Sequence, residues 1–377
     1  MRRLLALVPL LVASASLVGP ADAHAADLVC PPDTRLQGEP PPVGREQWCE
    51  LLDVDAAVFL RHGPSVEWHA NRTKRAEGSY SRGRLDGRWT TWHEDGSVYL
   101  QANYRSGALH GPFKQREATG ELLEGMYMEG RAIGVWTSRD AAGRVIAKGP
   151  YQGGERHGEW VFTLDESGRT LSGRYVRGVR EGSFTLASGD GTVLARGGFD
   201  GDERSGEWTE YDERGTLLAR GPYVEGERQG EWTLFSEDGR PSARGPYEAG
   251  VRGGEWTLFL DDGGRAVGEM AGDTRVGDWR HYTAAGRLQA SGPYVDDRPE
   301  GEWTFYGADG AVVGRGPMQG GERHGTWVEV TSAGLEMTGL YERGVRMGEW
   351  QAVAGAPRLP RTRAGAVTAR GRERAPE

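Results

Sequence analysis

Two consecutive stretches of the sequence decide the fold: YVEGERQGEWTLFSEDG at residues 223–239 and YEAGVRGGEWTLFLDDG at residues 247–263. Each begins with Tyr, has Gly at its fourth and eighth positions, and has Trp nine positions after the Tyr. The same pairing of an aromatic residue or Met with a later Trp or Phe occurs twelve times, and these later residues, the anchors, are 23 or 24 positions apart. Such a period indicates a repeat array in which each repeat buries its apolar face against its neighbours.

The anchors are the candidate core of the array. A Trp ring buries a large apolar area, so one ring per repeat would hold successive repeats together. Phe113 and Phe184 are the anchors of two repeats, and Met270 and Met318 replace the Tyr of two others, which is conservative for packing. We predict a structural aromatic ladder formed by Trp89, Trp136, Trp160, Trp208, Trp232, Trp256, Trp279, Trp303, Trp327 and Trp350.

The glycines predict that each repeat is a β-hairpin. Gly stands two positions before the anchor in all twelve repeats, and Asp-Gly pairs such as Asp238-Gly239, a strong hairpin signal, follow several anchors. The runs between them, such as residues 231–235, have the length of a common strand and are too short for a stable helix. We therefore predict an all-β fold, an elongated array of about twelve β-hairpin repeats of 23–24 residues.

The position three residues after the Tyr predicts a tight turn. It holds Gly in nine repeats and Asp in the other three. Because both residue types tolerate positive φ, this position would form the corner of the turn. We expect a positive φ here in every repeat, including those with Asp202, Asp273 and Asp297.

The pattern Tyr-x-x-Gly-x-x-x-Gly-x-Trp-x-x-Phe/Tyr-x-x-x-Gly, undisturbed in the two stretches quoted above, resembles the MORN repeat. It is similar to the variant form found in YwqK-like antitoxins of bacterial toxin-antitoxin modules. The resemblance covers roughly residues 61–350. It implies a β-hairpin array used as a scaffold, a membrane-associating surface or a toxin-neutralising partner, and it brings no catalytic residue.

The start of the chain predicts export. Residues 1–25 contain two Arg, an apolar stretch over residues 4–18 and an Ala-x-Ala site at residues 23–25, as in a secretory signal peptide. A membrane anchor is disfavoured because prolines interrupt the segment and it falls short of the ~20 apolar residues that a span needs. We expect the cleaved chain in the periplasm, at the cell surface or outside the cell.

The residues between the signal peptide and the array, 26–60, are expected to form an N-terminal cap. They contain both cysteines of the chain, Cys30 and Cys49, which would pair in an oxidising compartment. Lipid attachment at Cys30 is disfavoured by the larger residues before it, and a metal site would need two further ligands that are not obvious. We predict a Cys30–Cys49 disulfide that stabilises the cap by about 3 kcal/mol.

A degenerate copy of the repeat precedes the first full one. Gly63 and Trp68 lie 24 positions before Gly87 and Trp92, but Ser65 occupies the anchor position and Arg72 the turn position. Terminal repeats commonly deviate because one face meets solvent. At the other end, residues 351–377 are rich in Arg, Pro, Ala and Gly, a composition that predicts a disordered basic tail or one that contacts an anionic envelope component.

The sequence offers no recognisable catalytic, cofactor or metal site. His110, His157 and His324 each precede an anchor by three positions, but they belong to different repeats and are interpreted as a variable turn position. No zinc-ligand spacing, phosphate loop or nucleophile elbow is present. We therefore expect no enzyme and no cofactor. The net charge of −9 disfavours nucleic acid and anionic lipid as main ligands, and Arg-Gly pairs such as Arg220-Gly221 are interpreted as structural.

Charged residues also recur with the period of the array. Glu often precedes the anchor directly, and Arg often precedes it by four positions, so stacked repeats would align them in parallel rows of opposite sign along one edge. These rows are either a solvated ladder that favours solubility or a recognition strip for a charged protein partner. The candidate partner-binding arginines are Arg204, Arg228, Arg252 and Arg275.

Together these features favour an exported, non-enzymatic repeat protein that binds a protein partner along one face. A narrower hypothesis is an antitoxin or immunity protein that neutralises a toxin. The alternative is an envelope-associated scaffold that binds lipid or cell wall, with contact through the basic tail. The sequence names neither the partner nor the oligomeric state.

Overall fold

The computed structural model describes residues 28–55 and 57–353, so the predicted signal peptide and residues 354–377 of the predicted tail lie outside the described residues. The described residues form 33 β-strands, paired antiparallel, and no α-helix. None of them belongs to a helix long and apolar enough to span a bilayer. The all-β prediction is therefore confirmed.

The strands divide between two compact parts, an N-terminal part that ends at Arg131 and a C-terminal part that begins at Ala132. The N-terminal part contains β1 (Thr34–Glu39), β2 (Glu46–Asp53), β3 (Val58–Trp68), β4 (Lys74–Ser81), β5 (Arg84–Leu85), β6 (Gly87–Trp92), β7 (Val98–Arg105), β8 (Ala108–Leu109), β9 (Gly111–Arg116) and β10 (Leu122–Met128).

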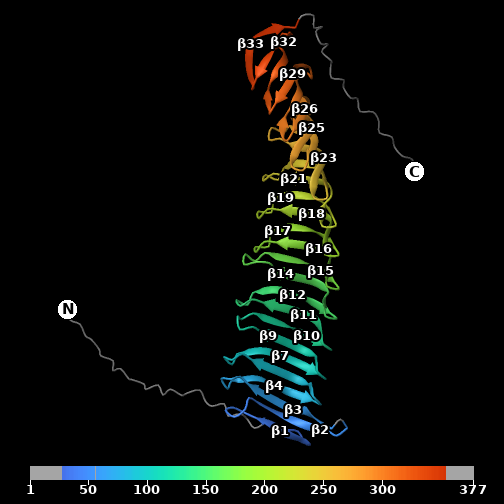
Figure 1. The fold of residues 1–377 in the computed structure, drawn as a ribbon. Coiled ribbons are helices and arrows are strands. Elements are labelled where there is room, and N and C mark those ends of the chain that lie inside the picture. The colour runs from blue at the N-terminus through green and yellow to red at the C-terminus, as the bar shows by residue number, and fades with distance from the viewer. Residues whose placement is uncertain (1–27, 56, 354–377) are drawn as a thin grey trace, which may run out of the picture. The chain divides into compact units, whose positions relative to one another are not determined.

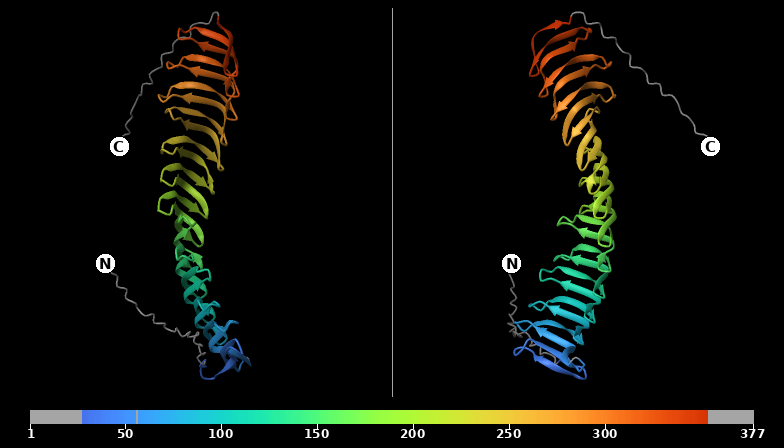
Figure 2. Two further views of the ribbon diagram at one scale, coloured as in Figure 1. Left: turned by 90° about the vertical axis from the view of Figure 1, so that its left-hand side faces the viewer. Right: turned by 45° about the vertical axis from the view of Figure 1, so that its right-hand side comes forward.

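The C-terminal part contains the other strands, of which β11 starts at the last residue of the N-terminal part. In this part successive hairpins lie one beyond the next, each beside its neighbours in the sequence (Figures 1 and 2). The strands are β11 (Arg131–Arg139), β12 (Val145–Gln152), β13 (Glu155–Arg156), β14 (Gly158–Thr163), β15 (Thr170–Val176), β16 (Val179–Ala187), β17 (Val193–Asp200), β18 (Glu203–Tyr211), β19 (Leu217–Val224), β20 (Glu227–Arg228), β21 (Gly230–Phe235), β22 (Pro241–Glu248), β23 (Val251–Phe259), β24 (Arg265–Ala271), β25 (Thr274–Tyr282), β26 (Leu288–Val295), β27 (Arg298–Pro299), β28 (Gly301–Tyr306), β29 (Val312–Gln319), β30 (Glu322–Arg323), β31 (Gly325–Val330), β32 (Glu336–Glu342) and β33 (Val345–Ala352).

One repeat shows how the sequence builds the sheet. The first strand, β19, carries Tyr223 and pairs with the second strand, which is split into β20 and β21. Gly230 lies at this split with a φ of 70°, a conformation that favours Gly, and the corresponding Gly has a positive φ in all twelve repeats. On its other side β21 pairs with β22 of the next repeat, which places Trp232 opposite Gly245. Each repeat is therefore a hairpin joined to its neighbours by backbone hydrogen bonds.

The turn after the Tyr is a two-residue hairpin turn. Val224 pairs with Glu227, which leaves Glu225 and Gly226 as the central residues, with φ of 51° and 81°. Positive φ at both central residues is the signature of a type I′ turn, which fits the twist of the flanking strands. The sequence predicted the second positive φ but not the first, because Glu is rarely found in that conformation.

The predicted positive φ at the three Asp-containing turns is correct for two of them. Asp202 and Asp297 have φ of 72° and 64°. The prediction is wrong for Asp273, whose φ is not positive; there the preceding Gly272 takes the positive value of 63°. Positive φ at the first central residue alone is the pattern of a type II′ turn, which favours Gly at that position.

The turn after the anchor is longer, and an Asp side chain supports it. Ser236 N donates to Arg240 O at 2.9 Å, and Gly239, with a φ of 78°, donates from its N to Ser236 O at 2.8 Å. This is a three-residue loop that ends in a left-handed Gly. The Asp238 carboxylate accepts a hydrogen bond from Arg240 N at 3.2 Å. The Asp-Gly pairs thus mark hairpins, as predicted, although the turn is not the two-residue type.

The anchor ring packs on the backbone of its own first strand. Trp232 is fully buried and donates from Nε1 to Pro222 O at 2.9 Å. The strand residue beneath the ring is Gly221, where an added Cβ would lie 2.5 Å from the ring. Arg220-Gly221 is therefore structural, as expected, since only Gly leaves room for the ring. The same close approach recurs beneath the anchors Trp89, Trp160, Phe184, Trp208, Trp256, Trp279, Trp303, Trp327 and Trp350.

Anchors and Tyr residues alternate in edge-to-face contact along one face of the sheet, called here the ring face. The ring of Trp232 lies 5.3 Å from Tyr223 of its own repeat and 5.9 Å from Tyr247 of the next, measured between centroids. Such contacts run unbroken from Trp136 to Trp256. Full burial of each ring contributes about 1.5–3 kcal/mol through removal of apolar area from water.

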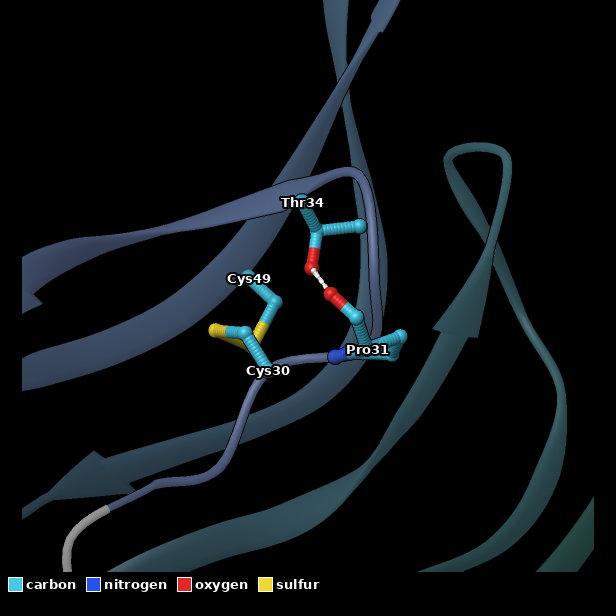
Figure 3. The surroundings of a disulfide bond; sticks show 4 residues. All are labelled: Cys30, Pro31, Thr34 and Cys49. Atoms are coloured by element: carbon cyan, nitrogen blue, oxygen red, sulfur yellow. Dashed lines mark hydrogen bonds between the residues drawn. A yellow bond between two sulfur atoms is a disulfide. The ribbon is translucent and has the colours of Figure 1, made fainter.

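The N-terminal residues are tied down by the predicted disulfide, which the structure confirms. Cys30 and Cys49 are bonded, with Cα atoms 5.5 Å apart, and Cys49 is fully buried (Figure 3). Next to the bond, Thr34 Oγ1 donates to Pro31 O at 2.6 Å (Figure 3). The residues expected to form the N-terminal cap contribute β1 and β2, which pair with each other, and β2 pairs with β3.

The degenerate repeat keeps the backbone of a full one. Gly63 and Arg72 both have positive φ, of 99° and 72°, as the sequence alignment with later repeats predicts. Ser65, at the anchor position, is fully buried and lies opposite Trp48 of β2. In a full repeat the positions are reversed, with Trp on the second strand and Gly on the first. The large and small residues have therefore changed places.

Candidate interaction surface

The candidate arginines line up along the ring face. In the pairing of β19 with β20, Arg228 lies opposite Tyr223, so its side chain shares the face of the rings. Its guanidinium lies 4.3 Å from the ring of Trp232 and 5.4 Å from that of Tyr247 in the next repeat. A guanidinium over an aromatic face is attracted by the ring quadrupole. The other members with such contacts include Arg156, Arg180, Arg204, Arg252, Arg275, Arg323 and Arg346.

Carboxylates neutralise most of these arginines. Arg228 Nη2 lies 2.6 Å from Glu210 Oε2, and the Arg275 and Asp297 side chains lie 2.8 Å apart. Burial alone would lower the pKa of Arg228, but the hydroxyl of Tyr223 and the charge of Glu210 outweigh it and raise that pKa. The side chain of Arg228 is only 27% exposed. The row is thus a half-buried layer over the rings, with little free positive charge.

The predicted parallel rows of opposite charge on one edge are not formed. Glu231 directly precedes Trp232, so its side chain points to the face opposite the rings. There it forms an ion pair with Arg244. In the next repeat Glu255 pairs with Arg280 at 2.7 Å on the same opposite face. Successive side chains of a strand point to opposite faces, so Glu231, which is next to Trp232, cannot share the ring face with Trp232 and Arg228.

A third position on the ring face varies in chemistry from repeat to repeat. It follows the anchor by two residues, so its side chain points to the same face as the anchor, and it is half-buried throughout. The sequence analysis missed this variable row. Its signal in the sequence is a position, two residues after each anchor, that has no fixed residue type. Its members in the C-terminal part are Ser138, Phe162, Leu186, Glu210, Leu234, Leu258, His281, Phe305 and Glu329.

Beside the variable row, the first strands present small side chains. Leu234 lies opposite Ala219 on one side and Ala243 on the other. Both alanines are buried. Most side chains of the variable row therefore have small neighbours across the adjacent strands, which leaves room for side chains of different size at this position.

The titratable members of the variable row have distinct environments. The rings of His281 and Trp303 lie 5.7 Å apart, and His281 Nε2 is 3.4 Å from the hydroxyl of Tyr294. Burial, together with the nearby charge of Arg275, lowers the pKa of His281, so its ring is neutral at pH 7. Glu329, in contrast, is an ion-pair partner of both Arg323 and Arg346, at 2.7 and 2.6 Å.

The three histidines that precede anchors lie at the break of the second strand. His157 N donates to Pro150 O at 2.9 Å, and His324 N donates to Pro317 O at 3.0 Å. His110 occupies the same place in the N-terminal part, with its N bonded to Asn103 O at 2.8 Å. Their backbones close the strand break, as expected of a turn position. Within residues 28–55 and 57–353, no group of three or more potential ligands is placed to hold a metal.

Comparison with known families supports the repeat. Residues 85–106 and 204–225 match the family described as MORN repeat variant. Each match runs from just before an anchor to the turn of the following repeat, so it covers the second strand of one hairpin and the first strand of the next. The finer resemblance to YwqK-like antitoxins stays a prediction. No curated protein matches the sequence significantly.

Two solved structures align with much of the chain. BamB from Moraxella catarrhalis is 11% identical, with 81% of this chain and 93% of that chain covered and a TM-score of 0.15. A mutant Tc holotoxin pore from Photorhabdus luminescens is 12% identical, with 85% of this chain and 19% of that chain covered and a TM-score of 0.16. TM-scores this low give no support to a fold or a function.

Proposed function

We propose that this chain is an exported, non-enzymatic repeat protein that binds a protein partner on the ring face of its C-terminal part. The variable row is the observation that carries the proposal. Anchors, glycines and Tyr residues recur in nearly every repeat and build a constant scaffold. In the variable row, by contrast, the half-buried side chain on the ring face is apolar, acidic, hydroxyl or imidazole, depending on the repeat. Interaction surfaces of repeat arrays combine constant packing with variable exposed positions in this way.

The half-exposed side chains suit protein recognition. Interface centres favour aromatic and apolar groups with arginine, and the ring face supplies Phe162, Phe305 and several leucines beside the arginine row. The arginines Arg204, Arg228, Arg252 and Arg275 contribute mainly by holding this surface in place, because their charges are already paired or bonded to Tyr hydroxyls.

Affinity capture tests the proposal. The chain without residues 1–25 is immobilised and exposed to an extract of the source cells, and bound proteins are identified by mass spectrometry. The matched variant replaces Phe162, Leu234 and Phe305 with Ser, which changes the variable row and leaves the anchors intact. We expect a partner that the parent captures and the variant loses while both give the same circular dichroism. A parent that captures nothing specific contradicts the proposal.

A narrower form of the same proposal is an antitoxin or immunity protein. It is supported by the similarity of the repeat pattern to YwqK-like antitoxins. Its test is co-expression with proteins encoded next to this one. A neighbour that is toxic alone, and that is inactive and co-purifies with this chain, is the expected result; neighbours that are harmless or that do not bind contradict the narrower form.

The alternative function is an envelope scaffold that binds lipid or cell wall through the basic tail, favoured by the six Arg within residues 351–377. Co-sedimentation with anionic liposomes or peptidoglycan, lost when residues 358–377 are deleted, would support this alternative. Capture of a protein partner that survives the same deletion favours the ring face instead.

A further inference from the structure

The C-terminal part ends in a strand that has a neighbour on one side only. β33 pairs with β32, and no described residue pairs with its other side, called here the free edge (Figure 1). An interior second strand such as β21 has a partner on both sides. Every residue of β33 except Trp350 is exposed. Unpaired backbone groups along an exposed edge favour the addition of another strand.

The repeat specifies what a strand at the free edge must offer. β21 faces residues 243–245 of β22, Ala-Arg-Gly, with Trp232 opposite the Gly. The same three residues stand at this place in β17 and β19. They occur once more in the chain, at residues 369–371, which lie outside the described residues. There Val367 stands two positions before the Ala, as Val193 does in β17.

The register of β21 with β22 gives each residue of this segment a place. Applied to β33, the register puts Ala369 opposite Ala352 and Gly371 opposite Trp350. A small residue then lies beside the Trp ring, as in the interior repeats. Two charged residues follow the Gly and take the places of the Pro and Tyr of a full repeat. The segment therefore has the small residues that the free edge requires.

The first of the two charged residues, Arg372, falls directly opposite Glu349 on the face away from the rings. Glu349 is exposed and forms no ion pair with any described residue. Arg370 falls at the place of Arg244, which is the ion-pair partner of Glu231. Glu349 would therefore gain one cationic group directly across from it and a second one beside it. Opposite charges on facing strands stabilise their pairing.

The second charged residue, Glu373, falls at the place of the next Tyr, beside Arg346. In interior repeats the equivalent Arg donates to the hydroxyl of that Tyr, as Arg228 does to Tyr247 at 3.4 Å. Arg346 lies 4.0 Å from the anchor ring of its own repeat and pairs with Glu329 through Nη2. Its other N–H groups can still donate, and a carboxylate accepts more strongly than a neutral hydroxyl. The charges of the segment thus match those of the free edge at both positions.

The connecting residues are long enough to bring the segment to the free edge. Sixteen residues separate Ala352 from Ala369, against eight between Leu234 and Ala243 in the interior. Neighbouring strands lie about 4.8 Å apart, so the longer connection spans the distance easily. Its additional entropic cost is small, because that cost grows only with the logarithm of loop length.

A second copy of the chain fits the free edge less well. If two free edges paired with Gly348 of each opposite Trp350 of the other, the two Glu349 side chains would lie directly opposite each other. Like charges at facing positions destabilise strand pairing. The segment from the same chain gives Glu349 a cation instead.

We propose that residues 367–373 pair with β33 as a further antiparallel strand and cover the free edge of the sheet, in the register given above. This strand shields the edge from other strands and so protects the array against edge-to-edge association. It also uses Arg370 and Arg372 within the chain, so these charges are not available to an anionic surface. The inference does not depend on the proposed function, because the segment and the edge belong to one chain.

Cysteine pairs test the register in the chain without residues 1–25. Ala352→Cys/Ala369→Cys joins two residues that face each other. The matched control is Ala352→Cys/Thr368→Cys, whose second Cys is one residue nearer in sequence but on the opposite face. Under mild oxidation we expect an intramolecular disulfide that forms about tenfold faster in the first variant, because the bond requires side chains directed at each other. Thiol titration and peptide mass spectrometry measure the rates. Equal rates, or a disulfide between two copies, would overturn the proposal.

Charge reversal tests the contact with Glu349. In the Ala352→Cys/Ala369→Cys background, Arg372→Glu should slow the disulfide about fivefold, the size expected of one cross-strand charge pair. Adding Glu349→Arg to this variant should restore the rate. Arg374→Glu is the matched control, since it makes the same charge change one residue beyond the paired positions, and it should leave the rate unchanged. Equal slowing by both reversals, or slowing by neither, would show that the assigned register is wrong.

Discussion

Gly221 and its counterparts lie directly beneath the anchor rings, and their missing side chains set how closely ring and strand approach. Trp232 lies so near Gly221 that an added Cβ would be 2.5 Å from the ring. The backbone of Gly221 belongs to a paired strand, and Trp232 is held through its bond to Pro222 O. Neither side can give way easily, so the glycine is required for space rather than for a positive φ.

Gly221→Ala is therefore expected to destabilise the protein by about 1–3 kcal/mol, the usual cost of overpacking. Urea unfolding followed by Trp fluorescence measures the change. The control is Gly253→Ala, because Gly253 has an ordinary φ and an added Cβ would meet nothing within 4 Å. That variant should be neutral or more stable by up to about 1 kcal/mol through lower entropy of the unfolded chain. Equal losses in both variants would contradict the ring-space explanation.

At the residue scale, the sequence predicted the structural role of the recurring residues but only some of their contacts. The Trp period predicted the ring contacts, and the fixed place of Arg220-Gly221 predicted a structural role. The contact between Gly221 and its ring depends on strand register, which local sequence does not specify. The prediction of a positive φ at Asp273 was wrong for a related reason. Either central residue of a two-residue turn can take the positive φ, and in this turn Gly272 does.

At the scale of the strand, an interior anchor differs from the terminal one. Trp232 is fully buried between two Tyr rings, whereas Trp350 in β33 has one aromatic neighbour among the described residues, Tyr341, and is half-buried. We expect Trp232→Ala to cost about 3–5 kcal/mol, as for other buried aromatic residues. Trp350→Ala should cost clearly less. Guanidinium unfolding of both variants gives the comparison, and equal losses would mean that neighbouring repeats do not share in burying the rings.

The turns after the anchors make stability depend on acid pH. Hydrogen bonds from Ser167, and then from Arg169, lower the pKa of Asp165 to about 2. Because this value is below that of the unfolded chain, the unfolded state binds more protons as the pH falls from about 4 to 2. The contribution of Asp165 to stability is therefore present above pH 4 and lost toward pH 2.

Asp165→Asn is accordingly expected to be less stable than the parent at pH 6, and the difference should shrink as the pH approaches 2. Urea midpoints measured across this range test the expectation. Glu166→Gln is the control, since Glu166 is the adjacent exposed carboxylate and forms no hydrogen bond with other described residues. A pH-independent difference for the Asp165 variant would contradict the assignment.

At the scale of the whole molecule, stability comes from contacts between neighbouring hairpins within each part. The repeat period predicted this organisation and the number of hairpins. It did not predict the division into two compact parts, because the repeat pattern continues through Arg131 with the same 23- or 24-residue spacing that holds elsewhere. Nor did it predict that Leu171 and Leu186 lie opposite each other across two strands. Pairing partners of this kind follow from register, which the repeat motif leaves unspecified at its variable positions.

Neighbour-only contacts predict that a whole repeat can be removed. Deletion of residues 223–246 joins Pro222 to Tyr247, so Gly206 gains Tyr247 as its partner in place of Tyr223, and every later pair keeps its register. We expect the shortened chain to keep its β circular dichroism and cooperative unfolding, with lower stability because one ring layer is lost. Deletion of only residues 223–234 removes half of that repeat and leaves the other half, which places Phe235 where Tyr223 belongs and breaks the alternation of strands. That chain should lose the cooperative transition of its C-terminal part. If both deletions unfold this part equally, its repeats do not act as interchangeable layers.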